Sequence, residues 1–172
     1  MVKDCSFVQF YCKVTRSLYH VLMDRIDRKL LNLLQRDASR TNVDMAEEVG
    51  LSPSSCLRRM QRLRASGIIE RVVAILNPAK AGRGIKAIVT VELKLHGEEH
   101  MRRFLHLASA EEAVSQAYAV TGESDVVLML RLKDMEEFSD LCDRLFRDQT
   151  NVARFFTMMV IKTGKEETAV RV

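Results

Sequence analysis

The sequence has few of the residues that break, cross-link or anchor a chain. Seven glycines and two prolines among 172 residues are too few for a collagen-like, low-complexity or linker-dominated protein. The four cysteines include no CxxC pair, which argues against a zinc ribbon and against a disulfide scaffold. No apolar run approaches the ~18 residues that a membrane span needs, so we expect no membrane partner.

The composition allows a folded protein with an uneven charge. Hydrophobic residues make up 47% and charged residues 29% of the chain, which fits a buried core. The length suits one ordinary domain or two small ones of roughly 50–100 residues. Residues 24–76 carry 10 basic and 7 acidic side chains, whereas residues 77–172 carry 14 and 15. This distribution indicates a module that binds a polyanion, joined to a near-neutral module that senses or assembles.

Residues 1–22 differ from the rest of the chain. They hold two of the four cysteines and four of the ten aromatic residues, without a sustained helical or strand period. Asp4 and Lys13 interrupt any secretory signal pattern, and Met23 directly precedes a well-formed helix start. We interpret residues 1–22 as an N-terminal extension that the fold can dispense with.

Two helices are predicted at the start of the basic module. The first begins at Asp24, a good N-cap, and repeats apolar residues at helical spacing. The second starts from the capping residue Asn42 and stops at Gly50. Their predicted inner faces are Ile26, Leu30, Leu33 and Leu34 for the first helix, and Val43, Ala46 and Val49 for the second.

A third helix and a strand complete this module. Ser52 is a predicted N-cap, Pro53 takes its favoured first helical position, and Gly67 follows the end of the helix. The β-branched segment Ile68–Leu76 then predicts a strand or a β-wing. We therefore expect a DNA-binding domain at residues 23–76 and a linker at 77–85.

After the linker the apolar period changes from 3.6 to 2, and strands and helices alternate. The order is β-α-β-β-α-β, which is typical of a ferredoxin-like antiparallel sheet with two helices on one face. The whole chain is thus α+β, a winged helix-turn-helix domain followed by this sheet domain at 86–165 and a tail at 166–172. The predicted strands are 87–95, 114–120, 126–132 and 152–162, and the predicted helices are 98–108 and 135–145.

One face of such a sheet carries no helix. Its outward residues include Ile88, Val127, Met129, and either Met158 or Met159. A bare apolar face of this kind usually pairs with a partner chain, so the pattern predicts a homo-oligomer.

The third helix carries the residues that suit DNA reading. From Ser52 to Ser66 there are four arginines and no acidic residue. Arginine forks and serine hydroxyls can bind base edges or phosphates, and the first residues of a recognition helix normally face the bases. We assign Ser54, Ser55 and Arg58 to base reading, and Arg59 and Arg62 to phosphate binding.

A solvated basic helix face in a protein–protein module is the alternative for this pattern. Cys56, on the opposite side of the same helix, has two interpretations as well. It is either a small buried residue that packs against the first helix or a redox-sensing thiol.

The chain resembles the leucine-responsive/asparagine-responsive (Lrp/AsnC) regulators over roughly residues 23–165. The segment DRIDRKLLNLLQRDASRTNVDMAEEVGLSPSSCLRRMQRLRASGIIERVVAILNP is similar to the DNA-binding domain of this family, and AVTGESDVVLMLRLKDMEEF is similar to its RAM/ACT-like ligand-sensing domain. The resemblance implies a cytoplasmic, nucleoid-associated prokaryotic regulator. It also implies a homodimer or a dimer-built octamer that binds double-stranded DNA.

The resemblance further implies a small effector, such as an amino acid, held between sensor domains. The effector loop of the family corresponds to Thr121, Gly122, Glu123, Ser124 and Asp125. Ser124 and Glu123 depart from the aromatic residue and the aspartate that are frequent there. Read from the residues alone, backbone amides near Gly122 could bind a carboxylate, and Glu123 or Asp125 an ammonium group. An ordinary polar β-turn is the other interpretation.

An enzyme is the main rival, because siroheme decarboxylases share this two-domain plan. His96 and His100 have a spacing that can bind a metal, but we interpret them as part of a solvated helix face. No nucleophile–base pair, phosphate loop or Cys/His cluster is visible. We therefore expect no catalytic residues, no metal and no cofactor, with an effector-blind architectural DNA binder as a further alternative.

Overall fold

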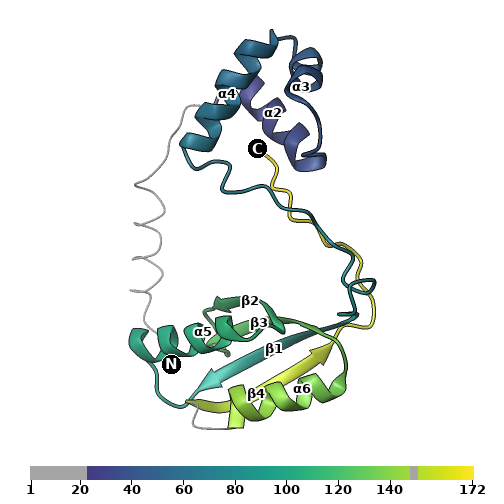
Figure 1. The fold of residues 1–172 in the computed structure, drawn as a ribbon. Helices are drawn as coiled ribbons and strands as arrows, with labels where there is room; N and C mark the ends of the chain where they lie inside the picture. Colours follow the sequence, from purple (N-terminus) through teal and green to yellow (C-terminus); the bar gives the residue numbers. More distant parts are fainter. Residues whose placement is uncertain (1–22, 148–150) are drawn as a thin grey trace. The chain divides into compact units, whose positions relative to one another are not determined.

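The computed structural model describes residues 23–147 and 151–172 (Figure 1). The described residues form two compact units, one comprising the described chain from residue 23 to Val73 together with Glu167–Val172, and the other comprising the described residues between Ala74 and Glu166. The predicted extension at 1–22 lies outside the described residues. Among the residues that are described, no helix is long and apolar enough to cross a membrane.

The first unit holds three helices: α2 (Arg25–Arg36), α3 (Asn42–Val49) and α4 (Pro53–Ala65). Asp24 caps α2 as predicted, and it forms a reciprocal capping box with Asp27. The expected cap of α3 was wrong: Thr41 is the N-cap, because its hydroxyl accepts the amide of Asp44, and Asn42 is the first helical residue.

The three helices pack around one small core. One predicted inner residue was wrong: Val43 is 58% exposed. Met45 lies on the buried side of α3 instead, because helical spacing alone does not fix which side of a short helix meets its neighbours. The buried residues of this core are Leu30, Leu31, Met45, Ala46, Cys56, Met60 and Leu63.

The predicted strand or β-wing at Ile68–Leu76 was wrong for this chain. Residues 68–76 have no strand conformation, and Val73 and Ile75 are 63% and 78% exposed. A β-branched sequence has strand propensity, but a strand also needs a partner for its backbone groups. None of these residues pairs in a sheet with any other described residue, so the helix-turn-helix carries no wing within the single chain.

The second unit has the predicted β-α-β-β-α-β order. Its strands β1 (Ile85–Leu93), β2 (Val114–Ala119), β3 (Val126–Leu132) and β4 (Val152–Met159) form an antiparallel sheet in the order β2-β3-β1-β4. The helices are α5 (Glu98–Ala110) and α6 (Met135–Cys142), and a π-helical turn, η1 (Asp143–Arg147), continues α6. This is the ferredoxin-like arrangement.

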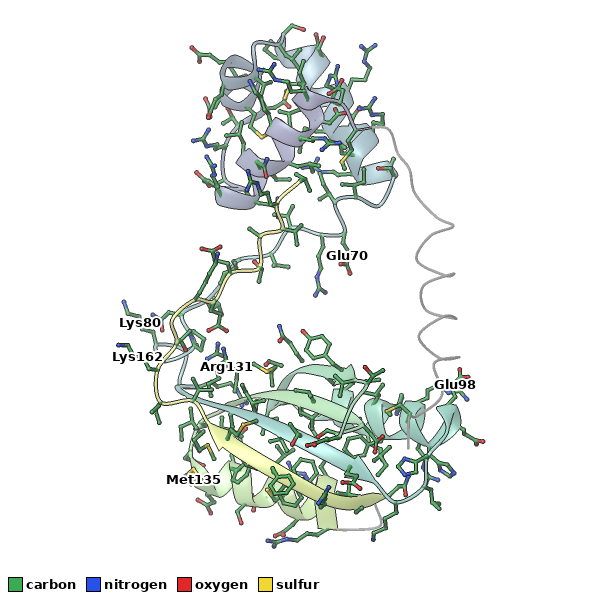
Figure 2. The ribbon with its side chains drawn as sticks, turned by 180° about the vertical axis from the view of Figure 1, so that it is seen from behind. Glu70, Lys80, Glu98, Arg131, Met135 and Lys162 are labelled. Carbon is green, nitrogen blue, oxygen red and sulfur yellow. The ribbon has the colours of Figure 1, made fainter. Side chains whose placement is uncertain are left out.

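The two helices cover one face of the sheet. They lie in front of the strands in Figure 1, whereas the strands lie in front of the helices in Figure 2. The covered face supplies the main core, with Val89, Leu128 and Leu130 fully buried. Strands β1 and β3 are central, and β3 throughout and β1 from Lys86 onward alternate between buried and half-buried residues, as expected for a sheet with one covered face.

The other face, which we call the open face, carries six large side chains at its centre. The register places Met158 and Met129 on either side of Ile88, and Phe156 and Val127 on either side of Thr90. Met158, not Met159, therefore belongs to this face, because Met159 pairs with Ala87 of the covered side. Tyr118, Phe156 and Met158 are 49%, 60% and 49% exposed. The open face consists of Ile88, Tyr118, Val127, Met129, Phe156 and Met158.

Candidate nucleic-acid interface and effector turn

The helices α3 and α4 form the predicted helix-turn-helix. Gly50 ends α3 with a φ of +73°, a conformation that glycine adopts without steric cost. The amide of Leu51 then bonds to the carbonyl of Ala46 at 2.8 Å, which closes the turn. Asn42 Nδ2 donates to the carbonyl of Pro53 at 2.7 Å, so the start of α3 is fastened to the start of α4.

The first turn of α4 presents hydroxyl groups and no carboxylate. Ser52 caps the helix, and its Oγ lies 2.9 Å from Ser55 Oγ and 3.2 Å from Ser54 Oγ. Ser54 is exposed and Ser55 is half-buried. Because no acidic side chain occupies this turn, the positive end of the helix dipole remains available to an anion.

The three arginines assigned to DNA differ in what surrounds them. Arg58 is exposed, and in the described part of the chain it has no ion-pair or hydrogen-bond partner. Arg59 Nη1 contacts Asp24 Oδ2 at 2.6 Å and Asp27 Oδ1 at 2.9 Å. Arg62 Nη2 contacts Asp27 Oδ2 at 2.5 Å. The structure thus adds that both predicted phosphate ligands already pair with carboxylates of α2.

The Asp27 carboxylate is a feature that sequence reasoning missed. It is fully buried, although its position in the first turn of α2 suggested only a favourable dipole interaction. A signal was present, since Asp27 precedes Leu30 and Leu31 by three and four positions and so shares their face. Hydrogen bonds from the Asp27 amide and from Arg59 hold the pKa of the Asp24 carboxyl below its usual range.

The five predicted effector residues form the turn between β2 and β3, which we call the effector turn (Thr121–Asp125). Gly122 has a φ of +127°, and a Cβ there would meet no atom within 4 Å. Thr121, Gly122 and Glu123 are exposed. The amides of residues 121–124 make no backbone hydrogen bond to any described residue, so they remain free to bind an anion.

Asp125 is hydrogen-bonded to strand β1 of the sheet. Its Oδ2 accepts the amide of Leu93 at 2.8 Å, and its own amide bonds to the carbonyl of Val91 at 2.9 Å. His96 Nδ1 lies 3.7 Å from Asp125 Oδ1. Asp125 therefore fixes the base of the effector turn, which leaves Glu123 as its exposed acid.

The remaining sequence candidates are Cys56 of α4 and the pair His96 and His100. Cys56 is fully buried, and burial raises the pKa of its thiol, which fits a packing role better than a redox one. Among the described residues, no group of three or more His, Cys, Asp or Glu side chains could hold a metal ion.

Comparisons with known proteins cover both units. Residues 23–64 match the AsnC-type helix-turn-helix domain, and residues 86–170 match the Lrp/AsnC ligand binding domain. The chain is 37% identical over 152 residues to an HTH-type transcriptional regulator of Sinorhizobium fredii, covering 88% of this chain and 90% of that protein. It is 33% identical over 152 residues to the leucine-responsive regulatory protein of Rhizobium meliloti, covering 88% and 97%.

Solved structures show the same arrangement. An AsnC family regulator from Agrobacterium tumefaciens is 29% identical, with a TM-score of 0.81 over 86% of this chain and 96% of that chain. A regulator from Neisseria meningitidis, solved in complex with L-methionine, is 30% identical with the same score and coverage. These relatives are transcriptional regulators and not enzymes. The chain belongs to the Lrp/AsnC family of DNA-binding transcriptional regulators, with a helix-turn-helix domain and a ligand-binding domain.

Proposed function

We propose that α4 enters the major groove of double-stranded DNA and reads bases with Ser54, Ser55 and Arg58. The observation that carries this assignment is the partner-free, exposed Arg58, which follows one turn after the hydroxyls of Ser54 and Ser55. A guanidinium group without a carboxylate partner keeps both arms of its fork for a guanine edge. The N-terminal turn of α4 is also the part of a recognition helix that usually faces the bases.

Arg59 and Arg62 bind backbone phosphates in this proposal. Each guanidinium has five N–H groups, and the hydrogen bonds to Asp24 and Asp27 use only Nη1 of Arg59 and Nη2 of Arg62. The Arg62 side chain is 50% exposed, which supports a phosphate contact more strongly than the 25% exposure of Arg59.

Two chains associate through the open face, as a dimer or as the unit of an octamer. The apolar centre of the open face is flanked by ion pairs, with Lys86 Nζ 3.0 Å from Glu166 near one end of β1 and Glu92 paired with Arg154 near the other. An apolar centre with a polar rim is the usual anatomy of a protein interface. A two-fold dimer would then present two copies of α4 to two half-sites.

The effector is an amino acid or a related small molecule, bound at the effector turn. The free amides of residues 121–124 suit a carboxylate, and the exposed Glu123 suits an ammonium group. The Neisseria relative whose structure holds L-methionine supports this class of ligand. A regulator of this kind works on the nucleoid, so we place the protein in the cytoplasm.

Alanine substitution at Arg58 tests the base-reading assignment. Binding sites selected from a random duplex library by the parent protein supply the operator, and fluorescence anisotropy measures affinity. Arg58→Ala should weaken operator binding by ~1–3 kcal/mol and relax sequence choice at one position. Lys29→Ala, which removes one exposed positive charge from α2 of the same unit, is the control. An Arg58→Ala protein that binds and selects like the parent would overturn the recognition-helix assignment.

A further inference from the structure

The carboxylate of Asp27 joins two helices of the first unit. It is the one charged side chain that is fully buried in the described part of the chain. Its Oδ1 accepts from Arg59 Nη1 at 2.9 Å, and its Oδ2 accepts from Arg62 Nη2 at 2.5 Å and from the Asp24 amide at 3.2 Å. Both carboxylate oxygens therefore have hydrogen-bond partners, and both arginines come from α4.

The stability of the fold alone does not require a buried carboxylate at position 27. A buried ion pair roughly balances its desolvation cost, and apolar residues of similar volume often serve equally well. Leu30 and Leu31 on the same side of α2 show that this face tolerates apolar side chains. What the carboxylate provides, and leucine would not, is a fixed place for two long cationic side chains.

The fixed place matters because Arg62 also reaches the surface. Its side chain is 50% exposed, whereas its carboxylate partner is 0% exposed. One arm of the guanidinium is thus anchored inside while other N–H groups face solvent. A long side chain that is already ordered loses less conformational freedom when it binds a phosphate.

We propose that Asp27 is a positioning residue for DNA binding, which holds Arg62, with Arg59 bracing the same carboxylate, for one backbone phosphate. This inference rests on the proposed function of α4. A phosphate contact of fixed geometry sets the register of the helix on the duplex. Asp27 therefore contributes to the preference for operator over random DNA, although it is itself out of reach of the nucleic acid.

The charges in this cluster make it possible to distinguish a positioning role of Asp27 from a general electrostatic effect on DNA binding. Asp24, Asp27, Arg59 and Arg62 sum to zero, so Asp27→Asn adds one net positive charge beside the DNA site. Binding to random DNA depends on charge and not on register. Loss of Asp27 should therefore weaken operator binding while random-DNA binding stays the same or strengthens.

The experiment measures the ratio of affinities for the selected operator and for a random duplex of equal length. Asp27→Asn should lower this ratio about threefold to tenfold. Glu48→Gln is the matched control, because it adds the same charge to the same unit by breaking the exposed pair with Arg40. Its ratio should stay within about twofold of the parent. Arg62→Gln should lower the ratio too, and adding Asp27→Asn to it should cause little further loss.

The outcomes distinguish the possible roles of Asp27. An equal fall in both affinities would mean a purely structural role, and an unchanged ratio would mean none; either overturns the proposal. If Asp27→Asn does not fold, judged by circular dichroism, Arg62→Gln decides, and an unchanged ratio in that folded variant overturns it. A parent protein that selects no sequence contradicts the proposed function, and this inference falls with it.

Discussion

Gln35 and Val170 lie 135 positions apart in the chain and exchange two hydrogen bonds. Gln35 Nε2 donates to the carbonyl of Val170 at 2.9 Å, and the Val170 amide donates to Gln35 Oε1 at 2.7 Å. Val172 packs against the core of the same unit, and the C-terminus lies beside α2 and α4 in Figure 1. The end of the chain is thus a structural part of the DNA-binding unit.

Gln35→Ala should destabilise the first unit. It removes both bonds to Val170, and exposed hydrogen bonds of this kind contribute about 0.5–1.5 kcal/mol each, at the lower end in solvent. We expect the thermal midpoint of this unit to fall by about 4–8 °C per kcal/mol lost, measured by calorimetry. Gln61→Ala, whose exposed side chain makes no hydrogen bond to another described residue, should leave the midpoint unchanged. Equal midpoints for the two variants would contradict a role for the tail.

A negative charge on the open face should separate the chains. Phe156→Glu places a carboxylate in the centre of the proposed interface, in both copies of a two-fold dimer. Burial of a phenylalanine side chain contributes about 1.5–3 kcal/mol, so losing two should raise the dimer dissociation constant about 10²–10⁴-fold. Light scattering at micromolar concentration should then give the 19.7 kDa mass of one chain.

Leu107→Glu provides the control for that experiment. Leu107 is 43% exposed on α5, outside the open face, so this variant should keep the mass of the parent. A Phe156→Glu variant that stays dimeric would place the interface elsewhere. A parent protein that is itself monomeric would contradict the association of two chains altogether.

Acid should weaken the start of α2 through Asp24. Bonds from the Asp27 amide and from Arg59 lower its pKa below the ordinary 3.8. Because the folded pKa lies below the unfolded one, the ionised carboxylate stabilises the fold above the unfolded value. That contribution is lost as the pH falls through the folded pKa. Asp24→Asn should therefore show a smaller drop in thermal midpoint between pH 7 and about pH 3 than the parent.

Glu70→Gln is the control for the acid experiment. Glu70 (labelled in Figure 2) is exposed and makes no ion pair with another described residue, so its substitution should leave the acid sensitivity of the parent unchanged. An Asp24→Asn protein that loses as much stability as the parent on acidification would contradict the role of this cap.

Much of the fold could be predicted because local signals agreed with the tertiary structure. Ser52, Pro53 and Gly67 mark the ends of α4 as expected, and the predicted strand 126–132 matches β3 to the residue. Ile88, Val127 and Met129 of the open face were predicted, whereas the strand register was needed to choose Met158 over Met159 and to add Tyr118 and Phe156.

Other features could not be predicted, because the conformation or burial of the residue depends on a partner that is far away in the sequence. Residues 68–76 have strand propensity but pair with no described strand, so propensity misled. Asp27 looked like a first-turn acid, yet the arginines of α4 draw it inside. Asp125, whose role as an effector ligand stays a prediction, also accepts the Leu93 amide and so belongs to the sheet. The contacts of Asp27 and Asp125 join residues that are at least 30 positions apart, which periodicity cannot reveal.

The central claim is that a small effector at the effector turn controls how the protein binds DNA. Gly122→Val is the informative variant, because a φ of +127° strains any β-branched residue there. Gly164→Val is its control, since Gly164 has open space and no such φ.

The most direct measurement is the operator affinity of the parent, Gly122→Val and Gly164→Val across a panel of the amino acids. The account predicts that at least one amino acid shifts the affinity of the parent and of Gly164→Val about 5–150-fold, the usual range of allosteric coupling. Gly122→Val should bind the operator normally without effector and give no shift. If no amino acid shifts the affinity of the parent, or if Gly122→Val responds as the parent does, effector control at this turn is contradicted.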